Sequence, residues 1–513
     1  MPLKKEMYLQ SMTIKEISEK IWESVSKLFV RIELFHYWTC EAWPEELAEI
    51  CRGCKELRLY FCDIAPPIMV NIIPDLLPKV FEYFNTFDKV IRRYNLDEER
   101  YYDIRHICLC VLGSILFPCF DHYDLRKCDK FAFEIAVDCL QMVSNIKKLT
   151  LPHISAEISE ERFSVVIGLK EVSYLNYCTN EFLDVIAISC PEIKVLNLRG
   201  SKKVDNSSVG GILRLQSLEF LDISSSSINS NGYETLLIGL ANVKNISWAD
   251  PIESIINNIP VENLSKITQV DVKIVTTESL CLQCPNISEL KISFCGQTVD
   301  LGRLYELKCL KKLHLYEFEM QPNNGYELLH LSGENLEELK FERVKDLDCA
   351  RIIVSCTNLK KMSIEDCHLH MSRRRGIVET MSHFKNLEIL KIVSAKNTDA
   401  YYTYIYYYKN LQNFKAYNIT EMDDIFINGI VRNGGFRNLV SFKTKGCPLG
   451  VRTIELLMEN CEQLCEIGYI RFWDNIDPGA IKILQDKLGT KNIALKLVFR
   501  QENKIFYDEI DHF

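Results

Sequence analysis

Apolar and cysteine positions recur at the same offsets in several parts of the chain. Three segments align without gaps, at 51–62, 284–295 and 356–367. Each begins with a cysteine, continues with apolar residues at fixed offsets, and ends with a second cysteine. In the second segment these positions are Cys284, Ile287, Leu290, Ile292 and Cys295. The two central apolar residues alternate with a polar one, which predicts a short strand with one buried face.

Related copies continue from about residue 146 to the end of the chain, about 20 to 28 residues apart. This matches the L-x-x-L-x-L-x-x-N/C pattern and the length of a leucine-rich repeat. The middle apolar position falls at Leu149, Val172, Leu196, Leu221, Ile246, Val270, Leu290, Leu313, Leu339, Met362, Leu390, Phe414, Phe442, Ile467 and Leu495.

One such unit cannot bury its own apolar face, so neighbouring units stack and share a core. Parallel strands then line a concave surface, and helices or turns return the chain on the outer side. We predict an α/β leucine-rich-repeat solenoid (a horseshoe) of about 15 repeats over 146–513. The Asn/Cys position near each strand end points into the core. Cys295, Cys367 and Cys447 occupy it here, as small buried side chains.

The N-terminal part follows a different pattern. Residues 1–145 are predicted to be mostly helical, with one repeat-like strand near 57–62. Three apolar stretches at 69–84, 101–117 and 130–143 have helical character. Because the open end of a solenoid must be shielded from water, we expect a helical cap here.

Composition narrows the class of protein. The 513 residues carry a net charge of −9, which argues against nucleic-acid binding along the whole chain. No apolar signal segment follows Met1, and no run of 18 apolar residues predicts a membrane span. The 21 cysteines are therefore expected to be reduced thiols in a cytoplasmic or nuclear protein, with neither membrane nor nucleic acid as a partner.

Three repeats, at 189–200, 283–295 and 355–367, resemble the cysteine-containing repeats of F-box/leucine-rich-repeat proteins. Those proteins are substrate receptors of Skp–cullin–F-box ubiquitin ligases. The resemblance extends over 146–513 and implies a protein partner, with a Skp-type adaptor and a cullin as further partners. An adaptor or scaffold unrelated to ubiquitination is the alternative.

An F-box begins with L-P-x-E-I-L and continues with I-F-x-Y-L. The nearest string here is PDLLPKVFEYF at 74–84, which is one residue shorter and has an extra proline at Pro78. It is interpreted either as a degenerate F-box or as a cap helix with a proline at its start. In the first case, the adaptor-binding residues are Pro74, Val80, Phe81, Tyr83 and Phe84.

Few residues suggest a catalytic or metal-binding site. The C-x-x-C pairs 51–54 and 281–284 would need two more ligands at set spacing to bind zinc, and the repeat alignment already accounts for Cys51 and Cys284. The cluster Cys367-His368-Leu-His370 could hold a metal but is expected to be a solvated loop. No catalytic or phosphate-binding motif is present, so we expect no enzyme activity, metal or cofactor.

Two further clusters have alternative interpretations. The basic run at 373–375 is either a solvated loop or a nuclear-localisation signal. Six tyrosines precede the strand at Phe414 and are either core residues or an exposed aromatic contact. They are Tyr401, Tyr402, Tyr404, Tyr406, Tyr407 and Tyr408.

The residue after each middle apolar position must face the concave surface, because strand side chains alternate. In the first six repeats these residues are Thr150, Ser173, Asn197, Asp222, Ser247 and Asp271, and none is basic. In the other nine they are Lys291, His314, Lys340, Ser363, Lys391, Lys415, Lys443, Gly468 and Lys496. We predict a basic strip that binds an acidic or phosphorylated partner segment. The alternative is a solvated face whose lysines are neutralised by residues such as Glu342 and Glu365.

Overall fold

The structure is a computed structural model of the chain. It describes residues 146–151, 166–294, 299–370, 386–395, 410–476 and 479, and the strands at 6–10, 31–35, 56–60, 122–124 and 496–498. The chain divides into two compact units, Met1–Val243 (unit 1) and Lys244–Phe513 (unit 2). This division lies inside the predicted repeat array, not at its predicted start at residue 146.

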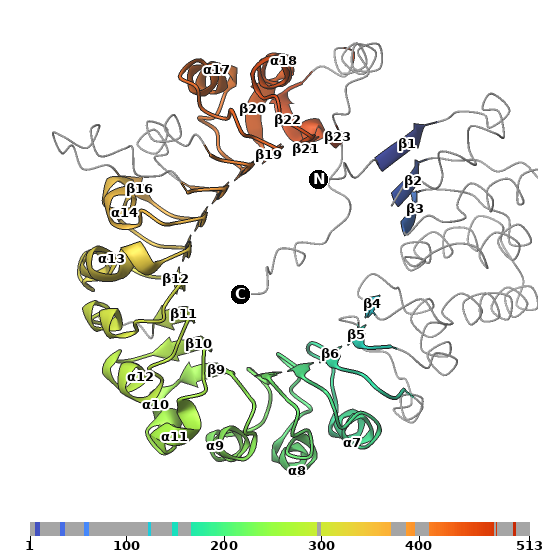
Figure 1. Cartoon of the computed structure of the whole chain (residues 1–513), viewed down its shortest axis with the longest axis vertical. Helices are drawn as coiled ribbons and strands as arrows, with labels where there is room; N and C mark the ends of the chain where they lie inside the picture. The colour runs from blue at the N-terminus through green and yellow to red at the C-terminus, as the bar shows by residue number, and fades with distance from the viewer. Residues whose placement is uncertain are drawn as a thin grey trace, which may run out of the picture. The chain divides into compact units, whose positions relative to one another are not determined.

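Unit 1 contains a five-stranded parallel sheet whose strands follow one another in sequence order (Figure 1). Its strands are β4 (His122–Asp124), β5 (Lys148–Thr150), β6 (Glu171–Ser173), β7 (Val195–Asn197) and β8 (Phe220–Asp222). The return segments include α7 (Asn180–Ser189), η4 (Asn206–Ser208), α8 (Val209–Ile212) and α9 (Ser230–Gly239). Thr179 and Asn229 begin α7 and α9 by accepting a backbone N–H with their side chains, as N-cap residues do.

The N-terminal region corrects the prediction of a single strand. A separate three-stranded parallel sheet consists of β1 (Glu6–Gln10), β2 (Arg31–Phe35) and β3 (Glu56–Tyr60). The sequence predicts helix at β1 and β2, and no strand at β4. Two alternating apolar residues in a short stretch do not separate strand from helix, which explains the error. The predicted cap helices and the adaptor-binding candidates at 74–84 lie outside the described residues.

Unit 2 contains an eleven-stranded parallel sheet, again in sequence order (Figure 1). Its strands are β9 (Asn245–Pro251), β10 (Gln269–Ile274), β11 (Glu289–Phe294), β12 (Lys312–Tyr316), β13 (Glu338–Glu342), β15 (Lys361–Glu365), β17 (Ile389–Val393), β18 (Asn413–Tyr417), β19 (Ser441–Lys445), β21 (Glu466–Gly468) and β23 (Lys496–Val498). Two small parallel pairs join β14 (Leu347–Asp348) to β16 (Leu369–His370) and β20 (Cys447–Gly450) to β22 (Trp473–Asn475).

The described helices return the chain on one side of this sheet, and none of them lies on its other face, the concave face (Figure 1). They are α10 (Glu253–Ile256), α11 (Val261–Leu264), α12 (Glu278–Gln283), η5 (Gly302–Glu306), α13 (Gly325–Ser332), η6 (Gly333–Asn335), α14 (Cys349–Ser355), α17 (Asp424–Arg432), α18 (Val451–Asn460) and η8 (Ile470–Phe472). Among the helices of the described residues, none has both the length and the apolar character needed to cross a bilayer.

The predicted middle apolar positions pair with one another across neighbouring strands within each unit. This holds from Leu149 to Leu221 in unit 1 and from Ile246 to Ile467 in unit 2, and each of these side chains is at most 3% exposed. The last position is wrong by two residues, because Leu497 and not Leu495 pairs with Ile467. A shift of two preserves the alternation, so the pattern alone does not distinguish the two registers.

A residue in the left-handed backbone conformation lies at or shortly after the end of nine strands of the two longer sheets, where the chain turns toward the core. The amide of Glu317 donates to the carbonyl of Glu342 at 2.9 Å, and the amide of Arg343 donates to that of Glu365 at 2.8 Å. Each of these corner residues thus adds one more backbone hydrogen bond between neighbouring strands. Residues of this kind are Asn176, Gly200, Ser225, Glu317, Arg343, Asp366, Ser394, Asn418 and Gly446.

The Asn/Cys position follows this corner residue and points inward, as predicted. Cys367 is 1% exposed and Cys447 is fully buried. The thiol of Cys367 donates to the carbonyl of Glu365 at 3.2 Å. Burial raises the pKa of Cys367 to about 12 and that of Cys447 to about 11, so both are thiols that pack as small apolar groups. Cys295 lies outside the described residues.

Candidate protein-binding surface

Three rows of side chains face outward on the concave face of unit 2. The middle row follows the predicted positions, and the strand register places its members side by side, about 5 Å apart by ordinary strand spacing. It contains Asp271, Lys291, His314, Lys340, Ser363, Lys391, Lys415, Lys443 and Gly468. Lys496 is the exception, since it pairs with Glu466 in the next row while Val498 pairs with Gly468.

The residues two positions before and two positions after the middle row face the same way, because side chains alternate along a strand. The first row contains Gln269, Glu289, Lys312, Glu338, Lys361, Ile389, Asn413, Ser441 and Glu466. The third row contains Lys273, Ser293, Tyr316, Glu342, Glu365, Val393, Tyr417 and Lys445. Most of the carboxylates on this face lie in these two outer rows.

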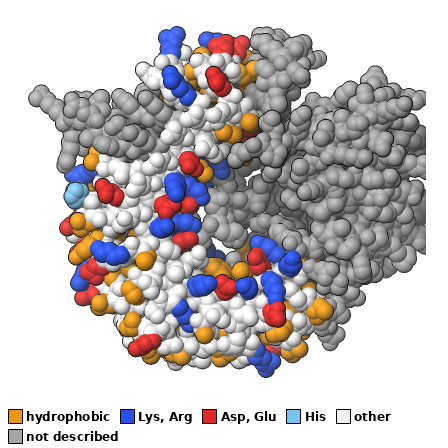
Figure 2. Space-filling model, in the orientation of Figure 1, with side chains coloured by type: hydrophobic (Ala, Val, Ile, Leu, Met, Phe, Trp, Pro, Cys, Tyr) orange, Lys and Arg blue, Asp and Glu red, His pale blue; other side chains and the backbone are white. Residues whose placement is uncertain are grey.

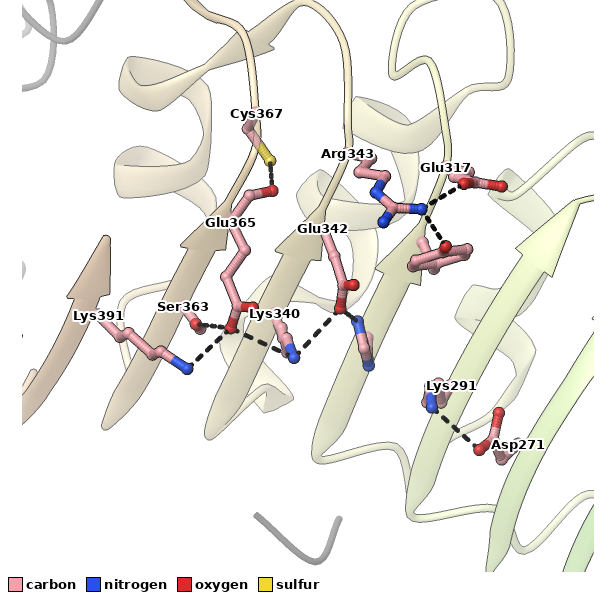
Figure 3. Close-up of polar contacts among 12 residues, drawn as sticks. Asp271, Lys291, Glu317, Lys340, Glu342, Arg343, Ser363, Glu365, Cys367 and Lys391 are labelled. Carbon is pink, nitrogen blue, oxygen red and sulfur yellow. Dashed lines mark hydrogen bonds and ion pairs between the residues drawn. The ribbon is translucent and has the colours of Figure 1, made fainter. Parts of the chain in front are cut away.

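Third-row carboxylates link the middle row into a chain of contacts across β12 to β17 (Figure 3). Glu342 lies 3.3 Å from the Nε2 of His314 and 3.2 Å from the Nζ of Lys340. Glu365 lies 3.3 Å from the Nζ of both Lys340 and Lys391. Each of the two carboxylates therefore bridges two basic residues of the middle row.

Other lysines on this face also have a carboxylate on the neighbouring strand. Lys291 contacts Asp271 at 3.0 Å, and Lys443 contacts Glu466 at 2.9 Å. In the first row, Lys312 pairs with Glu289 and Lys361 pairs with Glu338, each at 2.7 Å. Figure 2 shows basic and acidic side chains intermixed along this edge of unit 2. Several lysines of the middle row therefore have their charge neutralised by carboxylates of the chain itself.

His314 differs from the lysines because it is only 2% exposed. Burial of the imidazole away from solvent lowers the pKa of His314, and the hydrogen bond to Glu342 opposes this effect only in part. His314 is therefore neutral near pH 7. The hydrogen bond from His314 and the positive charge of Lys340 lower the pKa of Glu342 to about 2, although its partial burial acts in the opposite direction.

The charge balance changes between β15 and β17. On β10–β15 (the paired zone), the described outward positions hold five lysines and five carboxylates, so their formal charges cancel. They are Lys273, Lys291, Lys312, Lys340 and Lys361, with Asp271, Glu289, Glu338, Glu342 and Glu365. On β17–β21 (the lysine-rich zone), the described outward positions hold four lysines and one carboxylate, a formal charge of +3. They are Lys391, Lys415, Lys443 and Lys445, with Glu466.

The middle row of unit 1 lacks basic residues, as the sequence predicts. Thr150, Ser173, Asn197 and Asp222 lie in register across β5–β8. Asp222 is buried and accepts hydrogen bonds from the backbone N–H of Ser224 at 3.0 Å and from its hydroxyl at 2.7 Å. These contacts are typical of a local structural role.

The other candidates do not form a second site within the described residues. Cys281 and Cys284 are buried in the core, and burial raises the pKa of each thiol to about 12. No group of three or more potential metal ligands occurs in the described part of the chain. The C-x-x-C pair at 51–54, the arginines at 373–375 and the tyrosines at 401–408 lie outside it.

The repeat pattern and the parallel, in-register strands define a leucine-rich-repeat protein with an α/β solenoid fold. No family model matches the chain. The mouse CD180 antigen is 22% identical to it over 229 residues, which are 44% of this chain and 32% of CD180. The chain thus spans about a third of the length of this curated relative.

Several solved structures are similar to it at low identity. An internalin from Listeria monocytogenes is 13% identical, with a TM-score of 0.37, over 67% of this chain and 90% of its own. A leucine-rich-repeat protein from Leptospira interrogans is 14% identical, with a TM-score of 0.34, over 88% and 92%. A chain of the yeast Rad7–Elc1 complex is 13% identical, with a TM-score of 0.36, over 82% and 98%.

Proposed function

We propose that this chain is a non-catalytic recognition protein that binds a protein partner on the concave face of unit 2. The observation that supports this function is the long, in-register array of charged and polar side chains above a continuous apolar core. An array of this kind presents many contacts at fixed spacing on rigid strands, which favours the binding of an extended or convex protein surface. The partner is an acidic or a phosphorylated protein.

The ionisable groups of this face favour recognition over catalysis. A general acid or base works best with a pKa near the working pH and with access to the substrate. Glu342 has a pKa of about 2 and is held in ion pairs, and His314 is buried beneath its neighbours. Both groups are therefore poorly placed to transfer protons to or from a substrate.

We further propose that the chain acts as a substrate-receptor-like component of a Skp–cullin–F-box ubiquitin ligase. The support is the resemblance of the cysteine-containing repeats at 189–200, 283–295 and 355–367 to those of F-box/leucine-rich-repeat proteins. In this function, Pro74, Val80, Phe81, Tyr83 and Phe84 contact the adaptor, and the concave face selects the substrate. The ligase function requires the adaptor contact, whereas the recognition function does not.

Affinity purification of the tagged chain from its own cells, followed by mass spectrometry, tests both proposals. Ser293→Trp places a bulky group on the concave face, and Glu459→Trp places one on the exposed side of α18 as a matched control. We expect partners that are lost with the first variant and kept with the second. Partners that are equally retained by both variants would refute recognition by this face.

Recovery of a Skp-type adaptor and a cullin, lost on substitution of Phe81 and Phe84 by alanine, supports the ligase function. Thermal unfolding of each variant shows whether the chain still folds. Partners that are lost with Ser293→Trp, without any adaptor or cullin in the parent sample, would refute the ligase function and leave recognition intact.

A further inference from the structure

The middle row of the lysine-rich zone brings like charges together. Lys391, Lys415 and Lys443 are direct neighbours in the register of β17, β18 and β19. Like charges directly opposite each other on adjacent strands repel. Glu365 and Glu466 contact the two outer lysines at 3.3 and 2.9 Å, from either side of the zone. A segment that lies across this zone is stabilised if it brings further negative charge to the three lysines.

Apolar and aromatic side chains lie beside these lysines. Val393 and Tyr417 are half-buried in the third row, and the rings of Tyr417 and Tyr469 are 6.0 Å apart. Phe472 is 38% exposed, and the Nζ of Lys445 lies 5.0 Å from the centre of its ring. A surface that mixes such side chains with positive charge favours an occupant that is both apolar and acidic.

Residues 505–513 of the chain itself (the acidic segment) have this composition. Three of the nine residues are carboxylates, Asp508, Glu509 and Asp511, and none is lysine or arginine. Most of the others are apolar or aromatic, namely Ile505, Phe506, Tyr507, Ile510 and Phe513. The segment lies outside the described residues. Its three negative side chains match the formal charge of +3 on the described outward positions of β17–β21.

The position of β23 brings the acidic segment within reach of the lysines. β23 ends the sheet beside the lysine-rich zone, and its last residue, Val498, pairs with Gly468 in the middle row. In sheet order, β17 is four strands from β23, so Lys391 lies at about 19 Å by ordinary strand spacing. An extended chain covers about 3.3 Å per residue, so the ten residues from Val498 to Asp508 span up to about 33 Å. Lys415 and Lys443 are nearer still.

We propose that the acidic segment binds across the lysine-rich zone of its own chain. Its carboxylates contact Lys391, Lys415 and Lys443, and its apolar side chains contact Val393 and Tyr417. A protein partner that uses this zone must first displace the segment, which therefore competes with the partner. The competition rests on the proposed function, whereas the contact within the chain does not.

Carbodiimide cross-linking of the intact chain, followed by peptide mass spectrometry, tests the contact. The reagent joins a carboxylate to an amine where the two lie in direct contact. We expect cross-links from the acidic segment to Lys391, Lys415 or Lys443. The matched control is Lys308, an exposed lysine that follows η5 on the helix side of the sheet. Cross-links to Lys308 as frequent as those to Lys415, or none to the three lysines, would overturn the proposal.

A mixture of isotope-labelled and unlabelled chains shows which molecule supplies the segment. We expect both halves of each cross-linked peptide pair to carry the same label. Pairs that join a labelled to an unlabelled peptide as often as random mixing predicts would overturn the contact within one chain, because the segment of a second copy then occupies the zone.

Lysine reactivity gives a second measurement on a variant that lacks the carboxylates of the acidic segment. The triple variant is Asp508→Asn, Glu509→Gln and Asp511→Asn. We expect acetylation of Lys415 to be at least about threefold faster in the triple variant than in the parent. Lys340 contacts Glu342 and Glu365 of the paired zone, so its rate should change less than about twofold. Equal rates for Lys415 in the two proteins would contradict the contact.

Affinity purification separates failure of this inference from failure of the proposed function. Competition predicts at least about threefold more partner with the triple variant than with the parent. Equal recovery, with partners still lost in Ser293→Trp, would refute the competition and leave recognition by the concave face intact. Partners that are kept with Ser293→Trp would refute the proposed function, and the cross-links would still decide whether the segment binds the zone.

Discussion

Glu342 connects His314 and Lys340 across β12 and β13, and its removal provides a quantitative test of the contact network. Glu342→Gln keeps the size of the side chain and removes its charge. The pKa of Glu342 falls from an ordinary value of 4.5 to about 2 in the folded chain. A difference of this size corresponds to about 3 kcal/mol of stabilisation by the ionised form.

The side chain of Glu342 remains 25% exposed, so water screens part of this interaction. The glutamine amide can also accept one hydrogen bond in place of the carboxylate. We therefore expect the free energy of unfolding to fall by about 1 to 3 kcal/mol at pH 7. The loss is larger than for an exposed ion pair because His314 is buried and Lys340 is only 18% exposed.

The stabilisation by ionised Glu342 should depend on pH. A carboxyl whose pKa is lowered by folding stabilises the folded state above its unfolded pKa, and this contribution disappears as pH falls through the folded pKa. The difference between the parent and Glu342→Gln should be constant above about pH 5 and should shrink between pH 4.5 and 2. Urea unfolding followed by circular dichroism from pH 7 to pH 3 measures it. A difference that is absent at pH 7, or as large at pH 3 as at pH 7, would refute the reasoning.

Three more predictions concern stability and thiol reactivity. Lys340→Gln should lower the free energy of unfolding by about 1 to 2 kcal/mol, because Lys340 contacts both Glu342 and Glu365; an unchanged midpoint of urea unfolding would contradict this role. Gly446→Ala should cost about 1 to 3 kcal/mol, because φ is +61° and the new Cβ would lie 2.7 Å from a neighbouring side chain; an unaltered melting temperature would exclude this strain. Burial raises the pKa of Cys356 to about 12, so iodoacetamide at pH 8 should label the exposed Cys309 and spare Cys356 in the folded chain, as peptide mass spectrometry would show.

Much of the repeat architecture can be predicted from the sequence. Leu290, Leu313 and Leu339 mark three successive strands because each repeat buries an apolar residue against the same position of its neighbours. Strands are not predicted correctly where the pattern of apolar residues is short or ambiguous. The pattern misses β1 and β2, and it places the last strand two residues early, at Leu495.

The sequence predicts which lysines lie on the candidate surface but not the contacts that they make. Alternation along each strand identifies the lysines of the middle row, and the register confirms that they lie side by side. Charge balance depends on all three outward rows and on contacts between strands. The sequence already indicated Glu342 and Glu365 as residues that could neutralise lysines of the middle row, but not which lysine each one contacts.

By itself, the sequence determined the class of fold, the strand positions from 149 to 467 and the identity of the side chains that face outward on each strand. These follow from local alternation and from a period that repeats along the chain. Only the tertiary structure decided which contacts these side chains make, such as those of Glu342 and Glu365 with Lys340. Ion pairs form between side chains on different strands, and their geometry depends on register, rotamer and burial, none of which a repeat pattern specifies.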